Sequence, residues 1–379
     1  MFNQDKENVK SGITKADARI TSTQKPNIMQ NQKLILLFVF VLLGNIVFAQ
    51  YPSGNVVFDH LYSASLENPG GENPTRRVTV YLPPGYEESE QRYPVIYYLH
   101  GFTWSDSLMV ISSHIDKLLD KAIASGKIKP TIVVMPDQHT LFRGSWYTNS
   151  SLTGNWSDFT GIDLVNFIDK KYRTIPEWES RGIAGHSMGG QGAIRLGMLF
   201  PDVFSSVYAL SPATLGIVED IGIRGPAYRR IQEIQTREEL ITGWSEFYPN
   251  AIVAMGRAYS PNPDKPPFYA DLPFSYQNDS LIVDDEVLEL WISKSVIGMV
   301  DGHIDNLRKL KALKLDWGRN EENLHIPVTC EIFSLKLENL GIDHYAEEYI
   351  GDHSNKLWTD DGRALNDMLP FFDRYLKFE

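Results

Sequence analysis

The chain has 379 residues, 42% of them hydrophobic and 12% aromatic, so it is long enough to bury a large core in one α/β domain. Its formal net charge is −12 and it has no Lys- and Arg-rich run that could follow a phosphate backbone, which argues against nucleic acid as a partner. The single cysteine, Cys330, leaves no internal disulfide, no cysteine-based zinc site and no Cys-X-X-Cys redox pair.

An uncharged apolar run occupies residues 34–49. It is shorter than the roughly 20 residues that a membrane-spanning helix needs. Val47 and Ala49 stand at the −3 and −1 positions of a small-residue cleavage site before Gln50. We therefore expect residues 1–49 to be an N-terminal extension with a signal peptide that is cleaved after Ala49.

The stretch before the apolar run, residues 1–33, is long for the start of a signal peptide, whereas Met29 begins one of ordinary proportions. The hypothesis is that translation starts at Met29 and that residues 1–28 are not translated. The protein is then exported to the periplasm or the medium, with no stable membrane insertion after cleavage. The alternative is an uncleaved signal anchor.

Strand-like and helix-length segments alternate along the rest of the chain, which is typical of a mostly parallel sheet with helices on both faces. The predicted strands are 76–82, 94–99, 131–135, 181–185, 205–210, 311–316 and 343–349. The predicted helices between and after them are 108–125, 158–172, 189–200, 327–340 and 361–378.

One interval, at about 213–305, interrupts this alternation because it contains no clear strand. It holds a charged helix (227–244), a Pro-rich patch (261–267) and an acidic helix (283–294). We interpret it as an insertion between two late strands that forms a cap over the C-terminal edge of the sheet. A second folded domain or a linker is the alternative. The catalytic domain is then expected to cover 50–379.

The segment 185–189 reads G-H-S-M-G, which matches the G-x-S-x-G pattern of a nucleophile elbow. An apolar strand precedes it and a helix start rich in small residues follows. Such a turn strains the serine backbone, and its glycines are needed because a Cβ there would clash with the neighbouring strand or helix. The pattern predicts Ser187 as a nucleophile; an ordinary glycine-rich turn is the alternative.

A serine nucleophile needs a base, and in such folds the acid and the histidine follow the serine in that order. His353 comes just after the last predicted strand and ahead of the C-terminal helix. This places it at the C-terminal edge of the sheet, where open α/β sheets bind ligands. We therefore predict His353 as the base rather than His303, His325 or His344, whose predicted positions fit less well.

The acid should follow the predicted strand 311–316, where Asp316, Glu321 and Glu322 are candidates that spacing alone does not separate. The oxyanion hole should use the backbone N–H of Met188, the residue after the nucleophile, and that of Phe102, which follows the predicted strand 94–99.

Together these residues resemble the esterase D / feruloyl esterase family of α/β hydrolases. The resemblance covers about 76–378, interrupted by the insertion. The segments that carry it are YYLHGF (97–102), TGNWSDFTGIDLVNFIDKKYRT (153–174), GIAGHSMGG (182–190), LDWGRNEENLHIP (315–327) and YIGDHSNKLW (349–358).

The resemblance also bears on the acid, which in this family usually stands three residues after the glycine that ends the strand. Here that glycine is Gly318 and the position holds Glu321, where an Asp is commoner, so the resemblance favours Glu321 and keeps Asp316 in reserve. A second departure is the sequence Gly-Asp before His353, where family members often have Gly-Gly.

The resemblance implies hydrolysis of an ester or thioester through an acyl-enzyme, with no metal and no organic cofactor. Ser187 would attack, His353 would transfer the proton, and Glu321 would orient the imidazole. For an exported enzyme, feruloyl or acetyl esters on carbohydrates fit better than a cytosolic thioester. The alternatives are an acyltransferase with the same triad and a non-catalytic carbohydrate-binding relic of the fold. The sequence leaves the oligomeric state open.

Such substrates need a flat stacking surface and hydrogen-bonding groups, which the aromatic-rich loop 142–156 could supply. The predicted substrate-binding residues in it are Trp146, Tyr147, Asn155 and Trp156. The alternative is a structural loop whose aromatic rings pack inward. Residues 259–277 of the insertion are a further candidate for the wall of the acyl pocket.

Overall fold

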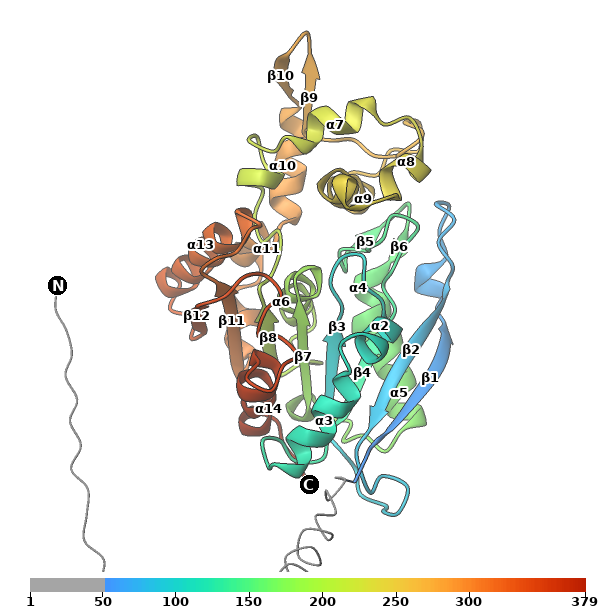
Figure 1. The fold of residues 1–379 in the computed structure, drawn as a ribbon, viewed down its shortest axis with the longest axis vertical. Coiled ribbons are helices and arrows are strands. Elements are labelled where there is room, and N and C mark those ends of the chain that lie inside the picture. Colours follow the sequence, from blue (N-terminus) through green and yellow to red (C-terminus); the bar gives the residue numbers. More distant parts are fainter. Residues whose placement is uncertain (1–51) are drawn as a thin grey trace, which may run out of the picture. The chain divides into compact units, whose positions relative to one another are not determined.

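An eight-stranded sheet runs through the middle of the molecule (Figure 1). The computed structural model describes residues 52–379, so the predicted signal peptide, the cleavage after Ala49 and the start at Met29 lie outside the described residues. Within residues 52–379, no helix is both long enough and apolar enough to cross a membrane.

The sheet has the strand order β1-β2-β4-β3-β7-β8-β11-β12. Its strands are β1 (Asn55–Tyr62), β2 (Thr75–Leu82), β3 (Val95–Leu99), β4 (Ile132–Pro136), β7 (Arg181–His186), β8 (Ser206–Leu210), β11 (Ala312–Gly318) and β12 (Tyr345–Tyr349). The pairs β1–β2 and β2–β4 are antiparallel, and every pair from β4 to β12 is parallel. The predicted mostly parallel sheet is confirmed, and each predicted strand is present to within two residues.

Strand β1 was missed because it lies at the edge of the sheet, where the alternation of buried and exposed side chains is weak. Of its eight residues only Asp59 is buried, while Phe58 is half exposed. The strand is defined by its pairing with β2 instead.

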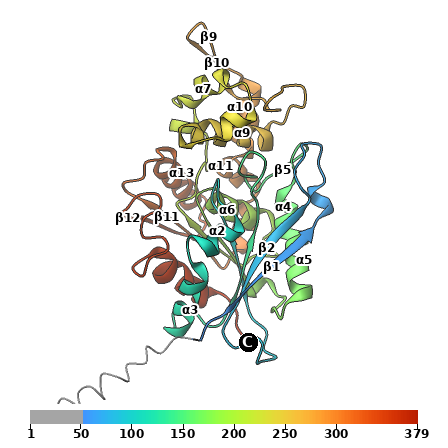
Figure 2. The same cartoon turned by 45° about the vertical axis from the view of Figure 1, so that its right-hand side comes forward.

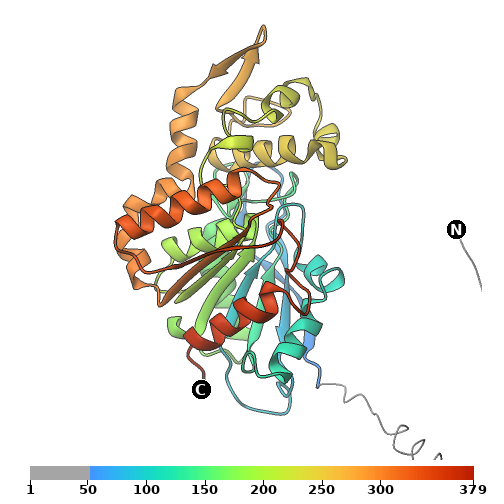
Figure 3. The same ribbon diagram turned by 60° about the vertical axis from the view of Figure 1, so that its left-hand side comes forward.

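Helices cover both faces of the sheet (Figures 1 and 3). Successive side chains of a strand point to opposite faces. In β3, Ile96 and Tyr98 therefore pack with α2, α3 and α14, whereas Tyr97 and Leu99 pack with α5, α6 and α13. The bounds of these helices are α2 (Asp106–Ile111), α3 (Ile115–Ala124), α5 (Leu164–Lys171), α6 (Met188–Leu199), α13 (His325–Asn339) and α14 (Leu369–Tyr375).

Three of the five helices predicted between and after the strands are interrupted. The prediction over 158–172 corresponds to a π-helical stretch, Phe159–Asp163, followed by α5. The prediction over 108–125 corresponds to α2 and α3, and the break ends at His114, which has a left-handed φ of 49°. The prediction over 361–378 corresponds to a π-helical stretch, Ala364–Met368, followed by α14. Pro370 has no N–H to donate to the carbonyl four residues back, so a regular α-helical bond is unavailable there.

Most of the segment between β8 and β11 lies beyond the C-terminal ends of the parallel strands (Figures 1 and 2), and its last helix returns alongside α6. The single helix predicted over 227–244 is broken into α7 and α8. The elements of the insertion are α7 (Ala227–Glu233), α8 (Arg237–Ile241), α9 (Phe247–Tyr259), β9 (Phe274–Gln277), β10 (Ser280–Val283), α10 (Asp285–Lys294), α11 (Val296–Met299) and α12 (Ile304–Lys309).

Helix α9 was not predicted, and all its residues from Pro249 onward are buried. The hairpin β9–β10 was also missed. Its two-residue turn, Asn278 and Asp279, has φ angles of 46° and 62°, the left-handed values that tight hairpins require.

Candidate active site

Ser187 stands on the sharp turn between β7 and α6. Its φ and ψ are 59° and −119°, outside the regions that a serine normally occupies. A Cβ on Gly189 would lie 2.0 Å from the carbonyl oxygen of Leu99, and one on Gly185 would lie 2.4 Å from the backbone of Gly189. Only glycine fits at both positions, so strand β3 and helix α6 can approach closely enough to hold the serine in its strained conformation.

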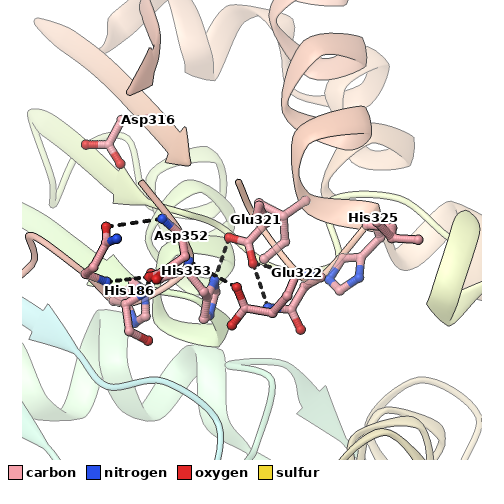
Figure 4. Close-up of polar contacts among 12 residues, drawn as sticks. His186, Asp316, Glu321, Glu322, His325, Asp352 and His353 are labelled. Atoms are coloured by element: carbon pink, nitrogen blue, oxygen red, sulfur yellow. Dashed lines mark hydrogen bonds and ion pairs between the residues drawn. The ribbon is translucent and has the colours of Figure 1, made fainter. Parts of the chain in front are cut away.

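His353 and Glu321 come from the loops after β12 and β11, and they meet directly (Figure 4). The Nδ1–H of His353 donates to Oε2 of Glu321 over 2.8 Å, and the Glu321 side chain has no exposed surface. A Cβ on Gly318 would lie 2.4 Å from the carbonyl oxygen of Gly351, so this glycine lets the two loops pack together. The hydrogen bond at Nδ1 leaves Nε2 of His353 free to accept a proton.

Asp316, the reserve acid, does not contact His353 and lies apart from it in Figure 4. Its carboxylate is buried, forms an ion pair with Arg363 and accepts a hydrogen bond of 2.9 Å from the hydroxyl of Tyr208. Burial raises the pKa of the Asp316 carboxyl, while the Arg363 guanidinium opposes this. The third candidate, Glu322, accepts only a long hydrogen bond of 3.4 Å from the backbone N–H of His353.

The N–H groups of Phe102 and Met188 are both available for an oxyanion. Neither donates to a protein acceptor within the part of the chain that the structure describes. Met188 is the first residue of α6, so its N–H belongs to the positive end of a helix dipole. The Phe102 ring is fixed between Trp146, at a centroid distance of 5.8 Å, and Phe247 of α9, at 5.6 Å.

His186 was given no role from the sequence, yet it contacts the loop of the candidate base. Its Nε2–H donates to the carbonyl oxygen of His353 over 2.8 Å, and the two rings lie 4.5 Å apart between centroids. Burial, together with the neighbouring His353, lowers the pKa of His186 well below its usual range. This shift disfavours the charged form of His186, and its hydrogen bond holds the backbone of His353.

The loop 142–156 does not form the predicted stacking surface. The side chains of Trp146, Tyr147 and Trp156 are all buried, and Tyr147 uses its hydroxyl to donate to the carbonyl oxygen of His100 over 2.8 Å. Asn155 is exposed and does not line the cavity around Ser187 that is described next. The rings pack inward, as in the alternative of a structural loop: Trp146 and Tyr147 belong to the main core cluster, and Trp156 packs with Leu66 and Phe159.

A cavity of about 360 Å³, here called the Ser187 pocket, contains both Ser187 and His353 in its walls. Apart from Phe102, which was predicted for its backbone N–H, its aromatic residues were not predicted from the sequence. They are Phe102, Trp104, Trp244, Phe247 and Tyr248. No residue of the range 259–277 lines this pocket. The signal that could have identified the wall is the aromatic cluster W-S-E-F-Y at 244–248.

Tyr248 links the insertion to Glu321. Its hydroxyl lies 2.6 Å from Oδ1 of Asn323 and 2.6 Å from Oδ2 of Asp220. Asn323 in turn donates from Nδ2 to Oε1 of Glu321 over 2.7 Å. The carboxylate oxygen that does not face His353 is therefore held by a short chain of hydrogen bonds that begins on α9.

We expect Tyr248→Phe to lower kcat by roughly 5- to 10-fold, the loss that goes with one hydrogen bond. The reason is that Asn323 would lose the partner that orients it toward Glu321. Steady-state kinetics checks this, with Tyr228→Phe as the matched control, since that hydroxyl donates only to the carbonyl of Ile221 in the insertion. An equal fall in both variants, or none in Tyr248→Phe, would contradict the role of the chain.

Within residues 52–379, no group of three or more His, Cys, Asp or Glu side chains is arranged to hold a metal ion.

The chain has the α/β-hydrolase fold. A strained serine follows a central strand of the mostly parallel sheet, and a histidine lies at the C-terminal edge of that sheet. The chain belongs to the putative esterase family, whose model matches residues 72–372. The family resemblance noted in the sequence is thereby confirmed.

Among curated relatives, an esterase of Mycobacterium tuberculosis is 36% identical over 143 residues, which are 36% of this chain and 29% of the relative. An endo-1,4-beta-xylanase/feruloyl esterase of Xylanibacter ruminicola is 33% identical over 149 residues, which are 36% of this chain and 19% of the relative. The matches thus span less than a third of the length of these relatives.

Solved structures show the same fold. A ferulic acid esterase aligns with a TM-score of 0.58 at 24% identity, over 86% of this chain and all of its own. An S-formylglutathione hydrolase from Agrobacterium tumefaciens aligns with a TM-score of 0.54 at 17% identity, over 86% of this chain and 97% of its own. At these identities the likeness supports the α/β-hydrolase fold.

Proposed function

We propose that this protein is a serine esterase that hydrolyses carboxylic esters through an acyl-enzyme. The observation that carries the proposal is that His353 lies with Ser187 in the wall of one pocket and is hydrogen-bonded from behind to the buried Glu321. A histidine whose Nδ1 is held by a buried carboxylate presents Nε2 as a base to a neighbouring hydroxyl.

In the proposed reaction, the Ser187 Oγ attacks the ester carbonyl carbon while its proton passes to Nε2 of His353. The negative oxygen of the tetrahedral intermediate is stabilised by the N–H groups of Phe102 and Met188. Glu321 stabilises the charged imidazole. The C–O bond then breaks, and His353 gives its proton to the leaving alcohol. Water repeats the steps on the acyl-enzyme and releases the acid.

We further propose that the substrates are feruloyl or acetyl esters on carbohydrates. The support is the aromatic wall of the Ser187 pocket and the similarity to a relative named endo-1,4-beta-xylanase/feruloyl esterase. The signal peptide predicted over 1–49 supports export to the periplasm or the medium, where such esters would be met.

The purified protein should release acid from methyl ferulate and from p-nitrophenyl acetate and butyrate, because water has access to the acyl-enzyme through an open pocket. Product analysis by chromatography, with and without an added acceptor alcohol, measures this. Free acid should stay the main product in both conditions. Transfer of the acyl group to the acceptor would favour the acyltransferase reading, and inactivity on all three esters would contradict the esterase.

A further inference from the structure

A second cavity of about 340 Å³, here called the Trp244 pocket, adjoins the Ser187 pocket. The two share four wall residues, Thr103, Trp104, Trp244 and Phe247. The Trp244 pocket lies between the loop after β3 and the insertion, which contributes residues from 241–250. A substrate with its ester group at Ser187 can therefore extend past these shared residues into a second space of similar size.

Trp244 gives this pocket a flat aromatic surface in contact with water. Its side chain is 80% exposed, the largest exposed fraction among the large hydrophobic side chains of the described chain. One face of its indole stacks on Phe247, at a centroid distance of 6.0 Å and an interplanar angle of 24°. The ring is thus supported from one side, and such a held, exposed aromatic is a typical platform for a ligand ring.

Asn250 supplies an unused polar group to the same pocket. It lines the pocket and is only 3% exposed, and its Oδ1 has no hydrogen-bond partner within residues 52–379. A buried acceptor without a donor is costly, so such a group is usually a site for a ligand or an ordered water. Arg143, whose Nη2 donates to the carbonyl of Ile241, lines the pocket as well.

We propose that the Trp244 pocket binds the sugar residue that carries the ester, which deepens the proposed function and rests on it. The apolar face of a sugar ring packs on an indole, and its hydroxyls both donate and accept hydrogen bonds. A hydroxyl can donate to the Asn250 amide and accept from the Arg143 guanidinium. A feruloyl ring offers a single hydroxyl, whereas a sugar ring offers several that can meet Asn250 and Arg143 together. We therefore place the acyl group in the Ser187 pocket and the leaving sugar in the Trp244 pocket.

The test compares two esters with the same acyl group, methyl ferulate and feruloylated arabinose. The wild-type protein should prefer the sugar ester in kcat/KM. Trp244→Ala should lower kcat/KM for the sugar ester roughly tenfold more than for the methyl ester. Asn250→Leu, which keeps the volume but removes the amide, should show the same selective loss. Tyr269→Ala is the matched control, because this half-exposed tyrosine of the insertion lines neither pocket.

Equal losses on both esters in Trp244→Ala and Asn250→Leu would overturn the proposal, because the pocket would then serve the acyl group or the fold. No loss on either ester would overturn it too. If the wild-type protein cleaves methyl ferulate but shows no preference for the sugar ester, the proposal that the Trp244 pocket binds the sugar is wrong, while the proposed esterase activity is supported. If the wild-type protein cleaves neither ester and does not react with a fluorophosphonate, the proposed esterase activity and the proposed sugar site are both wrong.

Discussion

Replacing Ser187 with alanine should lower kcat for ester hydrolysis by roughly 10³-fold or more, the loss that follows removal of a triad nucleophile. The attacking oxygen is lost, whereas the oxyanion donors and the pocket remain. Release of p-nitrophenol from its butyrate ester measures the rate. Labelling with a fluorophosphonate should be lost at the same time, because that reagent bonds covalently to an activated serine.

Ser105→Ala is a suitable control for this experiment, since Ser105 lies on the loop that carries Phe102 but lines neither of the two pockets. It should keep wild-type rates and labelling. Comparable unfolding midpoints would show that Ser187→Ala is folded. Full activity in Ser187→Ala would rule out the proposed acyl-enzyme at this residue.

The second prediction with a large expected effect distinguishes the role of Glu321 from that of Asp316. Glu321→Gln should lower kcat by roughly 10³- to 10⁴-fold while the protein stays folded, because an amide cannot stabilise the charged His353 ring and can favour the wrong tautomer. Asp316→Asn should instead lower the free energy of unfolding by about 3–5 kcal/mol, since the buried Arg363 charge loses its partner.

We therefore expect Glu321→Gln to lose catalytic rate and Asp316→Asn to lose stability. Kinetics at a temperature where both are folded, combined with urea unfolding, measures both quantities. If Asp316→Asn lost the rate and Glu321→Gln kept it, Asp316 would be the catalytic acid after all and the contact between His353 and Glu321 would be structural.

The sheet and the serine turn were predictable because their signals are local. The central parallel strands β3, β4 and β8 are buried over their whole length, and the turn at Ser187 needs glycines that a short motif reveals. The acidic residue of the candidate site was harder to predict. Asp316 and Glu321 are five residues apart, and nothing local tells which carboxylate turns toward the loop after β12. The family resemblance favoured Glu321, and the structure places Glu321 against His353.

The pocket walls could not be predicted from composition. The loop around Trp146 and the segment around Trp244 are both aromatic, yet Trp146 is 2% exposed and Trp244 is 80% exposed. Which of them reaches the surface depends on where α9 crosses the sheet edge, and this is set by long-range packing.

Two neighbouring residues at the start of α9 hold opposite sides of the candidate site: Phe247 packs on Phe102, and Tyr248 reaches Glu321 through Asn323. The insertion is therefore not a detachable specificity module. Exchanging it for that of a related protein, in order to change the substrate, would disturb the Phe102 loop and the Glu321 side chain together. A successful graft would have to carry the Phe-Tyr pair with it, so new specificities should be sought by substitutions within the insertion.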